Sequence, residues 1–185
     1  MNRSLRFAVY DGFFYSLMVG FGETYLSAYA IFLGADNAQL GVLSALPPFI
    51  AGLSQLLTVR LMKRFQSRRK LLCALVFLQA FALIPVCFAH LIPGFKVESY
   101  ILSVILFMSL GAIGGPIWNS WIGDLVSPEK RGQYFGMRNR VITIGTFASM
   151  IAAGYTLRYF KELGIEVVGF YAIFALAFGA RLFSC

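Results

Sequence analysis

The residue most able to do chemistry is Glu23, a carboxylate near the middle of a long apolar stretch, residues 8–33. On a helical projection of about 100° per residue, Glu23 falls on a stripe of small residues with Ser16 and Ser27. An ionised, unpaired carboxylate in hydrocarbon costs several kcal/mol, so in a bilayer Glu23 must face protein or water. Two interpretations stay open: a carboxylate that carries a proton or binds a substrate, which we favour, or a hydrogen-bonded residue that ties helices together.

Two other places hold polar residues inside apolar sequence. In residues 98–123, Trp118 and Asn119 follow a G-x-x-x-G pattern, which is typical of close helix contacts. These two side chains fit the lining of a pocket, and ordinary helix packing explains them about as well. Asp11 lies within two turns of the start of the first stretch, where contact with the helix N-terminus or interfacial water is sufficient.

Patterns of enzyme chemistry are absent from the sequence. We find no H-E-x-x-H, P-loop or G-x-S-x-G pattern, and the single histidine, His90, has no cluster of metal-ligating residues around it. We therefore expect no enzyme activity, no metal and no cofactor.

The elements that must position these residues are apolar stretches, each about as long as a helix that crosses a bilayer. Hydrophobic residues make up 59% of the 185 residues and charged residues 13%, more apolar surface than one soluble core of this size could bury. Backbone groups in lipid must be paired within the segment, which predicts an all-α membrane protein. Its expected transmembrane helices are about 8–33, 38–61, 70–91, 98–123, 137–158 and 166–184.

The basic residues predict the orientation of these helices. Of the sixteen Lys and Arg residues, only Lys96, Arg158 and Lys161 fall on one side of the expected membrane. The rest precede the first helix, flank the second and fourth loops, or, as with Arg181, lie near the end. The positive-inside rule therefore places both termini in the cytoplasm, in a cell membrane or bacterial inner membrane. The net charge of +8 follows from this topology and needs no nucleic acid.

The loop after the fourth helix carries a recognisable pattern. It reads GDLVSPEKRGQYFGMRN over residues 123–139, with an acid at the helix end, then Pro-Glu-x-Arg-Gly and Gly-x-Arg-Asn. This loop resembles the cytoplasmic loop of major facilitator superfamily transporters. Residues 60–70 resemble the family's basic signature loop in part, because Arg60 stands where a glycine is usual and Arg64 where an aspartate is usual.

The resemblance covers the whole chain as the N-terminal half of that family's fold. It implies a six-helix bundle of two inverted three-helix repeats, and secondary transport of a small organic solute by alternating access. The partners would be the lipid bilayer, the solute, and a C-terminal six-helix half or a second copy of the chain. The alternative is a truncated or degenerate membrane protein that transports nothing or serves in assembly.

The resemblance also suggests roles for particular residues. Helices one and four line the family's central cavity, which agrees with Glu23, Ser16, Ser27, Trp118 and Asn119 as a substrate or proton pathway. The loops would form a cytoplasmic gate in which Asp124 pairs with basic residues, and Arg138 caps a helix or pairs with the same carboxylate. The gate residues are Arg68, Arg69, Asp124, Arg131 and Arg138. The alternative interpretation is that these charged residues form no gate and only determine the topology of the chain in the membrane. The fourth helix lacks the arginine of many proton-coupled members, which leaves Glu23 without an obvious cationic partner.

Overall fold

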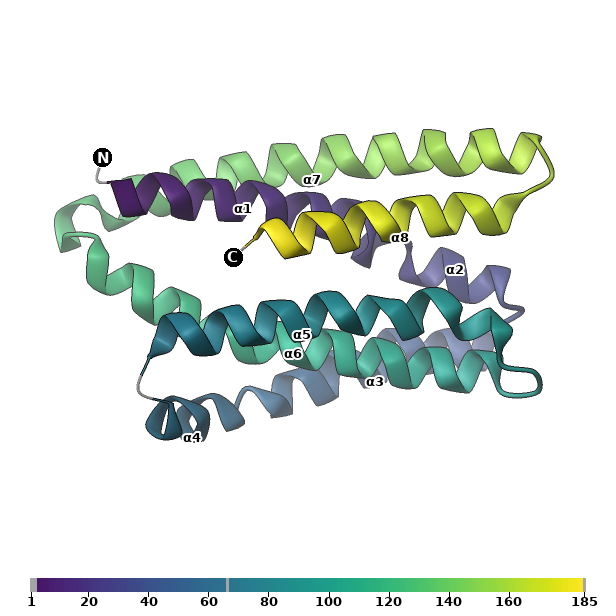
Figure 1. The fold of residues 1–185 in the computed structure, drawn as a ribbon, viewed down its shortest axis with the longest axis horizontal. Helices are drawn as coiled ribbons and strands as arrows, with labels where there is room; N and C mark the ends of the chain where they lie inside the picture. Colours follow the sequence, from purple (N-terminus) through teal and green to yellow (C-terminus); the bar gives the residue numbers. More distant parts are fainter. Residues whose placement is uncertain (1–2, 66, 185) are drawn as a thin grey trace. The chain divides into compact units, whose positions relative to one another are not determined.

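The computed structural model describes residues 3–65 and 67–184, which form helices joined by short turns (Figure 1). The helices are α1 (Arg3–Phe21), η1 (Glu23–Tyr25), α2 (Leu26–Phe32), α3 (Asn37–Ser54), α4 (Leu57–Arg64), α5 (Arg68–Phe88), η2 (Ala89–Leu91), α6 (Lys96–Leu125), η3 (Pro128–Lys130), α7 (Arg131–Glu162) and α8 (Glu166–Phe183). No strand occurs in this described part, as the all-α prediction requires.

The chain divides into two compact units. Unit 1 comprises Met1–Glu23 and Ile117–Cys185, and unit 2 comprises Thr24–Pro116. The chain passes from one unit to the other at two places: between Glu23 and Thr24, and inside α6 between Pro116 and Ile117. Unit 1 therefore contains the whole of α1, α7 and α8, together with the last turns of α6.

Five segments of the described chain are long and apolar enough to cross a membrane. They are Asn37–Arg64, Arg68–Leu91, Lys96–Leu125, Pro128–Glu162 and Glu166–Phe183. The first expected span, 8–33, is not among them, and the structure divides it: α1 ends at Phe21, and a 3-10 turn precedes the seven residues of α2. Glycine at position 22 disfavours further α-helix and lets the chain approach α8, where a Cβ added to Gly22 would lie 3.1 Å from Ala177 Cβ.

The fifth span extends well beyond the expected residues 137–158. Pro128 starts the 3-10 helix η3, and α7 follows directly from Arg131 to Glu162. Proline is suited to this place because its fixed φ angle fits the first turn of a helix and its missing N–H is not needed there. As a result, Arg131 and Arg138 belong to a helix, whereas the sequence placed them in or beside a loop.

In unit 1, α1, α7 and α8 pack against one another, as Figure 1 also shows. Small residues bring α1 and α7 close together: Gly20 faces Ser149, and Gly145 faces Ser16. Ser16 is fully buried, and its carbonyl accepts hydrogen bonds from Thr146 Oγ1 and Ser149 Oγ, each at 3.4 Å. The stripe of small residues on α1 is thus, in part, a packing surface.

Replacement of Gly20 by Ala is expected to destabilise unit 1 by about 2 kcal/mol, the usual cost of overpacking a tight contact. The added Cβ would collide with Ser149 Oγ and lie 2.7 Å from the main-chain oxygen of Thr146. Unfolding in detergent titrations measures the change. The matched control is Gly52→Ala in α3, where no atom lies within 4 Å of the added Cβ; equal destabilisation by both variants would contradict this packing account.

Unit 2 is held together by two buried tyrosines. Tyr29 and Tyr100 are fully buried, with ring centroids 5.4 Å apart in an edge-to-face arrangement. The Tyr29 hydroxyl donates to the carbonyl of Cys87 at 2.6 Å, and the Tyr100 hydroxyl donates to the carbonyl of Leu26 at 2.7 Å. These bonds connect α2, α5 and α6 while satisfying both hydroxyls away from water.

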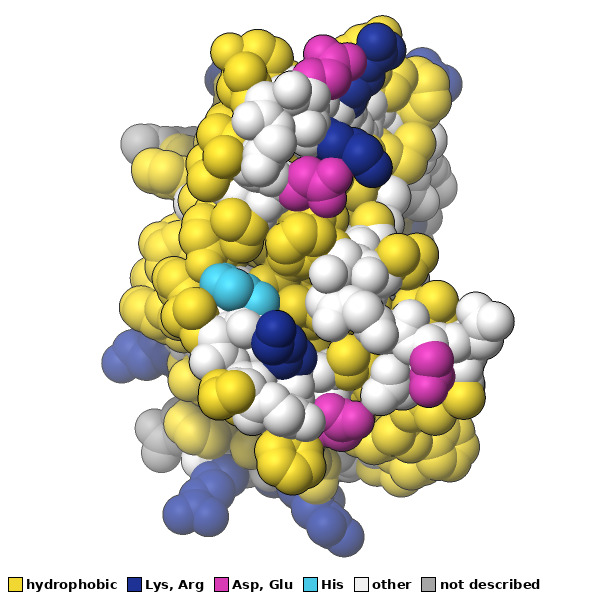
Figure 2. All heavy atoms as spheres, turned by 90° about the vertical axis from the view of Figure 1, so that its right-hand side faces the viewer, with side chains coloured by type: hydrophobic (Ala, Val, Ile, Leu, Met, Phe, Trp, Pro, Cys, Tyr) yellow, Lys and Arg dark blue, Asp and Glu magenta, His cyan; other side chains and the backbone are white. Residues whose placement is uncertain are grey.

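The surface is unusually apolar. Hydrophobic side chains make up much of the face in Figure 2, with acidic and basic side chains among them. Large residues such as Phe49, Leu102 and Phe147 are each at least 60% exposed. Exposed apolar side chains of this number suit contact with lipid rather than water.

Candidate functional site

A network of charged side chains connects three helices of unit 1, and it begins with an ion pair between α1 and α7. Arg138 Nη2 lies 3.5 Å from Asp11 Oδ2, with the two side chains 12% and 24% exposed. Arg138 Nε also donates to the carbonyl of Ala8 at 3.4 Å. The arginine passes directly over Gly12, where an added Cβ would lie 3.0 Å from Nε. Glycine at position 12 therefore makes room for this ion pair.

Trp118 joins the same network from α6. The guanidinium carbon of Arg138 lies 3.7 Å from the centre of a Trp118 ring, a cation–π contact. Trp118 packs in turn on Phe135 and on the small core formed by Ala8, Ile122, Val126 and Tyr134. Trp118 thus gives Arg138 a second contact besides its ion pair with Asp11.

The third helix of the network is α8, which contributes Ser184 and Arg181. Ser184 Oγ donates to Asp11 Oδ1 at 2.6 Å, and Arg181 Nη1 donates to Ser184 Oγ at 3.2 Å. Arg181 is only 8% exposed, and its guanidinium carbon lies 5.4 Å from the centre of the Tyr15 ring. Asp11 is therefore the acidic centre of the network, with arginines on both sides.

Sequence reasoning missed much of this network. The sequence explains Asp11 by a contact with the helix end or the interface, and it gives Arg181 a role in topology. The signal for Arg181 was an arginine inside the apolar run 166–184, a position where a charge is expensive unless it faces protein. Ser184 belongs to no sequence motif, and its position in the sequence does not predict a contact with Asp11.

The residues expected to form a pathway lie in different surroundings. Glu23 begins η1 and interacts electrostatically with Arg181. Trp118 lies in the charged network, Asn119 is exposed on α6, and Ser27 is exposed on α2 in unit 2. Ser16 is buried in the contact between α1 and α7, a place that suits packing.

The expected gate residues also differ in their partners. Arg131 donates to two main-chain oxygens at the end of α6, from Nη2 to Gly123 at 2.8 Å and from Nε to Val126 at 3.2 Å. Arg131 thus caps carbonyls at the C-terminal end of α6, and Arg138 pairs with Asp11. The expected pairing of Asp124 with a basic residue of either loop stays a prediction. Asp124 is exposed in unit 1, and Arg68 and Arg69 are exposed at the start of α5 in unit 2.

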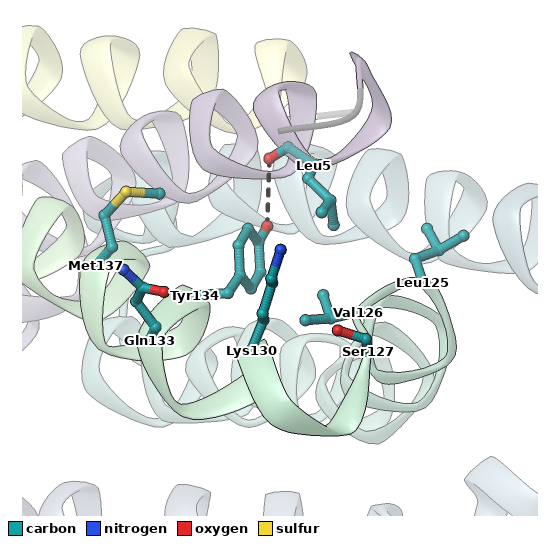
Figure 3. Close-up of a pocket in the computed structure, with 8 residues that line it drawn as sticks. All are labelled: Leu5, Leu125, Val126, Ser127, Lys130, Gln133, Tyr134 and Met137. Carbon is teal, nitrogen blue, oxygen red and sulfur yellow. Dashed lines mark hydrogen bonds between the residues drawn. The ribbon is translucent and has the colours of Figure 1, made fainter.

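A cavity of about 480 Å³ lies beside this network, between the start of α1 and the turn that joins α6 to α7 (Figure 3). Its walls combine apolar and polar side chains, among them the charged side chain of Lys130. Two of the lining residues are joined by a hydrogen bond, in which the Tyr134 hydroxyl donates to the carbonyl of Leu5 at 3.3 Å. The lining residues are Leu5, Leu125, Val126, Ser127, Lys130, Gln133, Tyr134 and Met137.

We looked for metal-ligating side chains that lie close together in the described part of the chain. Within residues 3–65 and 67–184, no group of three or more His, Cys, Asp or Glu residues could hold a metal ion.

Apolar helices long enough to cross a bilayer, with a charged network on their inner contacts, define an integral membrane protein. The family model of the Major Facilitator Superfamily matches residues 12–184. The chain therefore belongs to this superfamily, whose members are transporters, and the sequence resemblance is confirmed. No curated protein and no solved structure matches the chain.

Proposed function

We propose that this chain is the N-terminal six-helix half of a secondary transporter that moves a small organic solute by alternating access. In this proposal α1, η1 and α2 together form the first of six spans, and the six spans form two inverted three-helix repeats. Both termini lie in the cytoplasm, as the distribution of Lys and Arg predicts. The C-terminal half, or a second copy of this chain, completes the cavity.

The observation that carries the proposal is the network centred on Asp11. Ion pairs are costly inside a membrane, and intramembrane charges usually belong to the pathways of substrates, ions or protons. Here they join α1, α7 and α8, with Trp118 of α6 against Arg138. Alternating access requires contacts that hold one arrangement of helices and can break in another, and a network of this kind meets that requirement.

The pathway in this proposal follows α1 and α6. Glu23 is its ionisable residue, because it lies deep in the first span and no described residue forms an ion pair with it at contact distance. The other residues that the proposal assigns to the pathway are Trp118 and Asn119 of α6, Ser27 of α2, and Ser16 of α1. Ser16 belongs to the path only if α1 and α7 separate during transport.

The cytoplasmic gate in this proposal consists of Arg68, Arg69, Asp124, Arg131 and Arg138. Arg131 fixes the end of α6 through Gly123 and Val126, and so sets where Asp124 is presented. Arg138 fixes the start of α7 against α1. Arg68 and Arg69, at the start of α5, are the basic residues of the second loop that the proposal assigns to the gate.

Replacement of Arg131 by Ala is expected to loosen this gate. The variant leaves the last carbonyls of α6 without their arginine cap, so the α6–α7 turn becomes free to move. Cysteines introduced into the proposed transport cavity should then react with a thiol reagent from the cytoplasmic side at least about tenfold faster, since each lost hydrogen bond to a charged donor is worth about 1.5 kcal/mol or more. Arg140→Ala, in the same helix and exposed, is the control; equal labelling rates for Arg131→Ala and the unmodified protein would remove Arg131 from the gate.

The proposal that the chain is half of a transporter has its own test, the gene sequence that follows the codon for Cys185. Six further apolar stretches, in frame or after one frameshift, would support it. A stop codon followed by an unrelated gene would leave a second copy of this chain as the other half. In that case, cross-linking in the membrane should give dimers, and failure to cross-link would contradict the proposal.

A further inference from the structure

Arg181 has hydrogen-bonding capacity that its surroundings do not use. One of its nitrogens, Nη1, donates to Ser184 Oγ. Its Nε atom is buried and has no hydrogen-bond partner within residues 3–65 and 67–184. A buried guanidinium is costly unless an anion compensates it and its donors are satisfied. The unused donor of a side chain that is 8% exposed therefore points to an anionic partner that this arrangement does not engage.

The packing of α1 on α8 shows where such a partner would lie. The two helices run in opposite directions (Figure 1), with Ser184 against Asp11 at one end of their contact and Ala177 against Gly22 at the other. Ala177, Arg181 and Ser184 are spaced by four and three residues, which places them on one face of α8. Arg181 thus faces α1, between the levels of Asp11 and Gly22.

Glu23 follows Gly22 directly and is the acidic residue at the far end of this contact. Arg181 interacts electrostatically with both Asp11 and Glu23. The two acids are twelve positions apart in sequence, or about 18 Å along a helix, which is too far for one guanidinium to touch both. Arg181 must therefore engage one acid at a time.

We propose that Arg181 is the cationic partner of Glu23, and that it alternates between Glu23 and the Ser184–Asp11 pair as Glu23 loses and gains a proton. The inference rests on the proposed role of Glu23 as the ionisable residue of the pathway. Ionised Glu23 attracts Arg181. When Glu23 takes a proton from water, Arg181 returns to Ser184 and competes with Arg138 for Asp11. The proton on Glu23 is thereby coupled to the ion pair that holds α7 against α1.

Few other ionisable groups face this pair. Tyr15, on α1, interacts electrostatically with Glu23, Arg181, Arg138 and Asp11. From α7 the group that takes part is Arg138, which is paired with Asp11, and from α8 it is Arg181 itself. Arg181 is the cation that acts on Glu23 in this set, so substitutions at Arg181 should dominate the titration of Glu23.

The test is an infrared titration of Glu23 in the full chain, reconstituted in lipid vesicles. The carbonyl band of protonated Glu23 is identified by its loss in Glu23→Gln. Removal of the positive charge in Arg181→Gln should move the titration midpoint of Glu23 up by about one pH unit, a tenfold change in its proton affinity. Arg181→Lys should restore most of the difference. Arg158→Gln, which removes an exposed charge paired with Glu162, should leave the midpoint unchanged. Equal midpoints in Arg181→Gln and the unmodified chain would overturn the proposal.

A second measurement avoids any change at Arg181, in case that variant does not fold. In the chain labelled with ¹⁵N-arginine, the Nε signal of Arg181 should change with pH, and the change should disappear in Glu23→Gln. A signal that is independent of pH in the unmodified chain would also overturn the proposal. Both measurements report on the pairing of Glu23 with Arg181 and not on transport. If Glu23→Gln left transport intact, Glu23 would lose its proposed role as the ionisable residue of the pathway, while its pairing with Arg181 could still be observed.

Discussion

Replacement of Glu23 by Gln is expected to abolish ion-driven transport by the complete protein while leaving membrane insertion unchanged. Glutamine keeps the size and hydrogen-bonding capacity of the side chain but cannot carry a proton or a negative charge. Arg181 would then stay with Ser184 and Asp11 at every pH, and the helices could no longer respond to the ion gradient. Uptake and export assays in energised vesicles should show activity reduced to background, a loss of at least about 100-fold, comparable to the loss of an essential proton-transfer group.

The matched control for this variant is Asp36→Asn. Asp36 is an exposed acid that caps α3 through Gln39, and asparagine caps helices as well as aspartate does. Transport by Asp36→Asn should remain within about twofold of the unmodified protein, because its cap energy is retained. Unchanged transport by Glu23→Gln at every pH tested would remove Glu23 from the coupling role.

The second large effect is expected for Arg138→Gln, which leaves the Asp11 carboxylate without its partner from α7. Removing one member of a largely buried ion pair costs roughly 3 kcal/mol, because the remaining charge stays buried and unpaired. The variant also removes the cation–π contact with Trp118 and the bond to the carbonyl of Ala8. Unfolding of the reconstituted chain by denaturant should occur at a correspondingly lower midpoint.

A double-mutant cycle separates the ion pair from the other contacts of Arg138. With Asp11→Asn already present, Arg138→Gln should cost at least about 1 kcal/mol less than it does alone, since contacting charges are coupled by such amounts. Arg158→Gln breaks an exposed pair with Glu162 and should cost no more than about 0.5 kcal/mol. Additive costs for Asp11→Asn and Arg138→Gln would show that the ion pair contributes nothing to the stability of unit 1.

The sequence was sufficient for the class of protein and for most of the helices. Apolar length and composition alone predict the spans near 38–61, 70–91, 98–123 and 166–184, because a bilayer demands long helices of apolar residues. The motif of residues 123–139 identified the family. The first span was less predictable, because periodicity carries no information about Gly22, whose contact with Ala177 comes from a distant part of the chain.

The charged network was much less accessible to sequence reasoning. Asp11, Arg138 and Arg181 are far apart along the chain, and only the packing of α1 on α7 and α8 brings them together. The positive-inside rule counts arginines without asking whether they face lipid, water or protein. It therefore counts Arg181 as an interfacial charge, although Arg181 is 8% exposed and donates to Ser184. A sequence also does not show which helix carbonyls lack partners, so the bonds of Arg131 to Gly123 and Val126 could not be predicted.

Alternating access is the central claim, and labelling of a cysteine at position 119 tests it most directly. Asn119 is exposed on α6 and belongs to the proposed pathway. In the full-length gene product, with Cys73, Cys87 and Cys185 replaced by Ser, Asn119→Cys is treated with a membrane-impermeant maleimide from each side of oriented vesicles. Alternating access predicts labelling from both sides, with a ratio that shifts when an ion gradient is applied. Labelling from neither side, or from one side only under every condition, would contradict it.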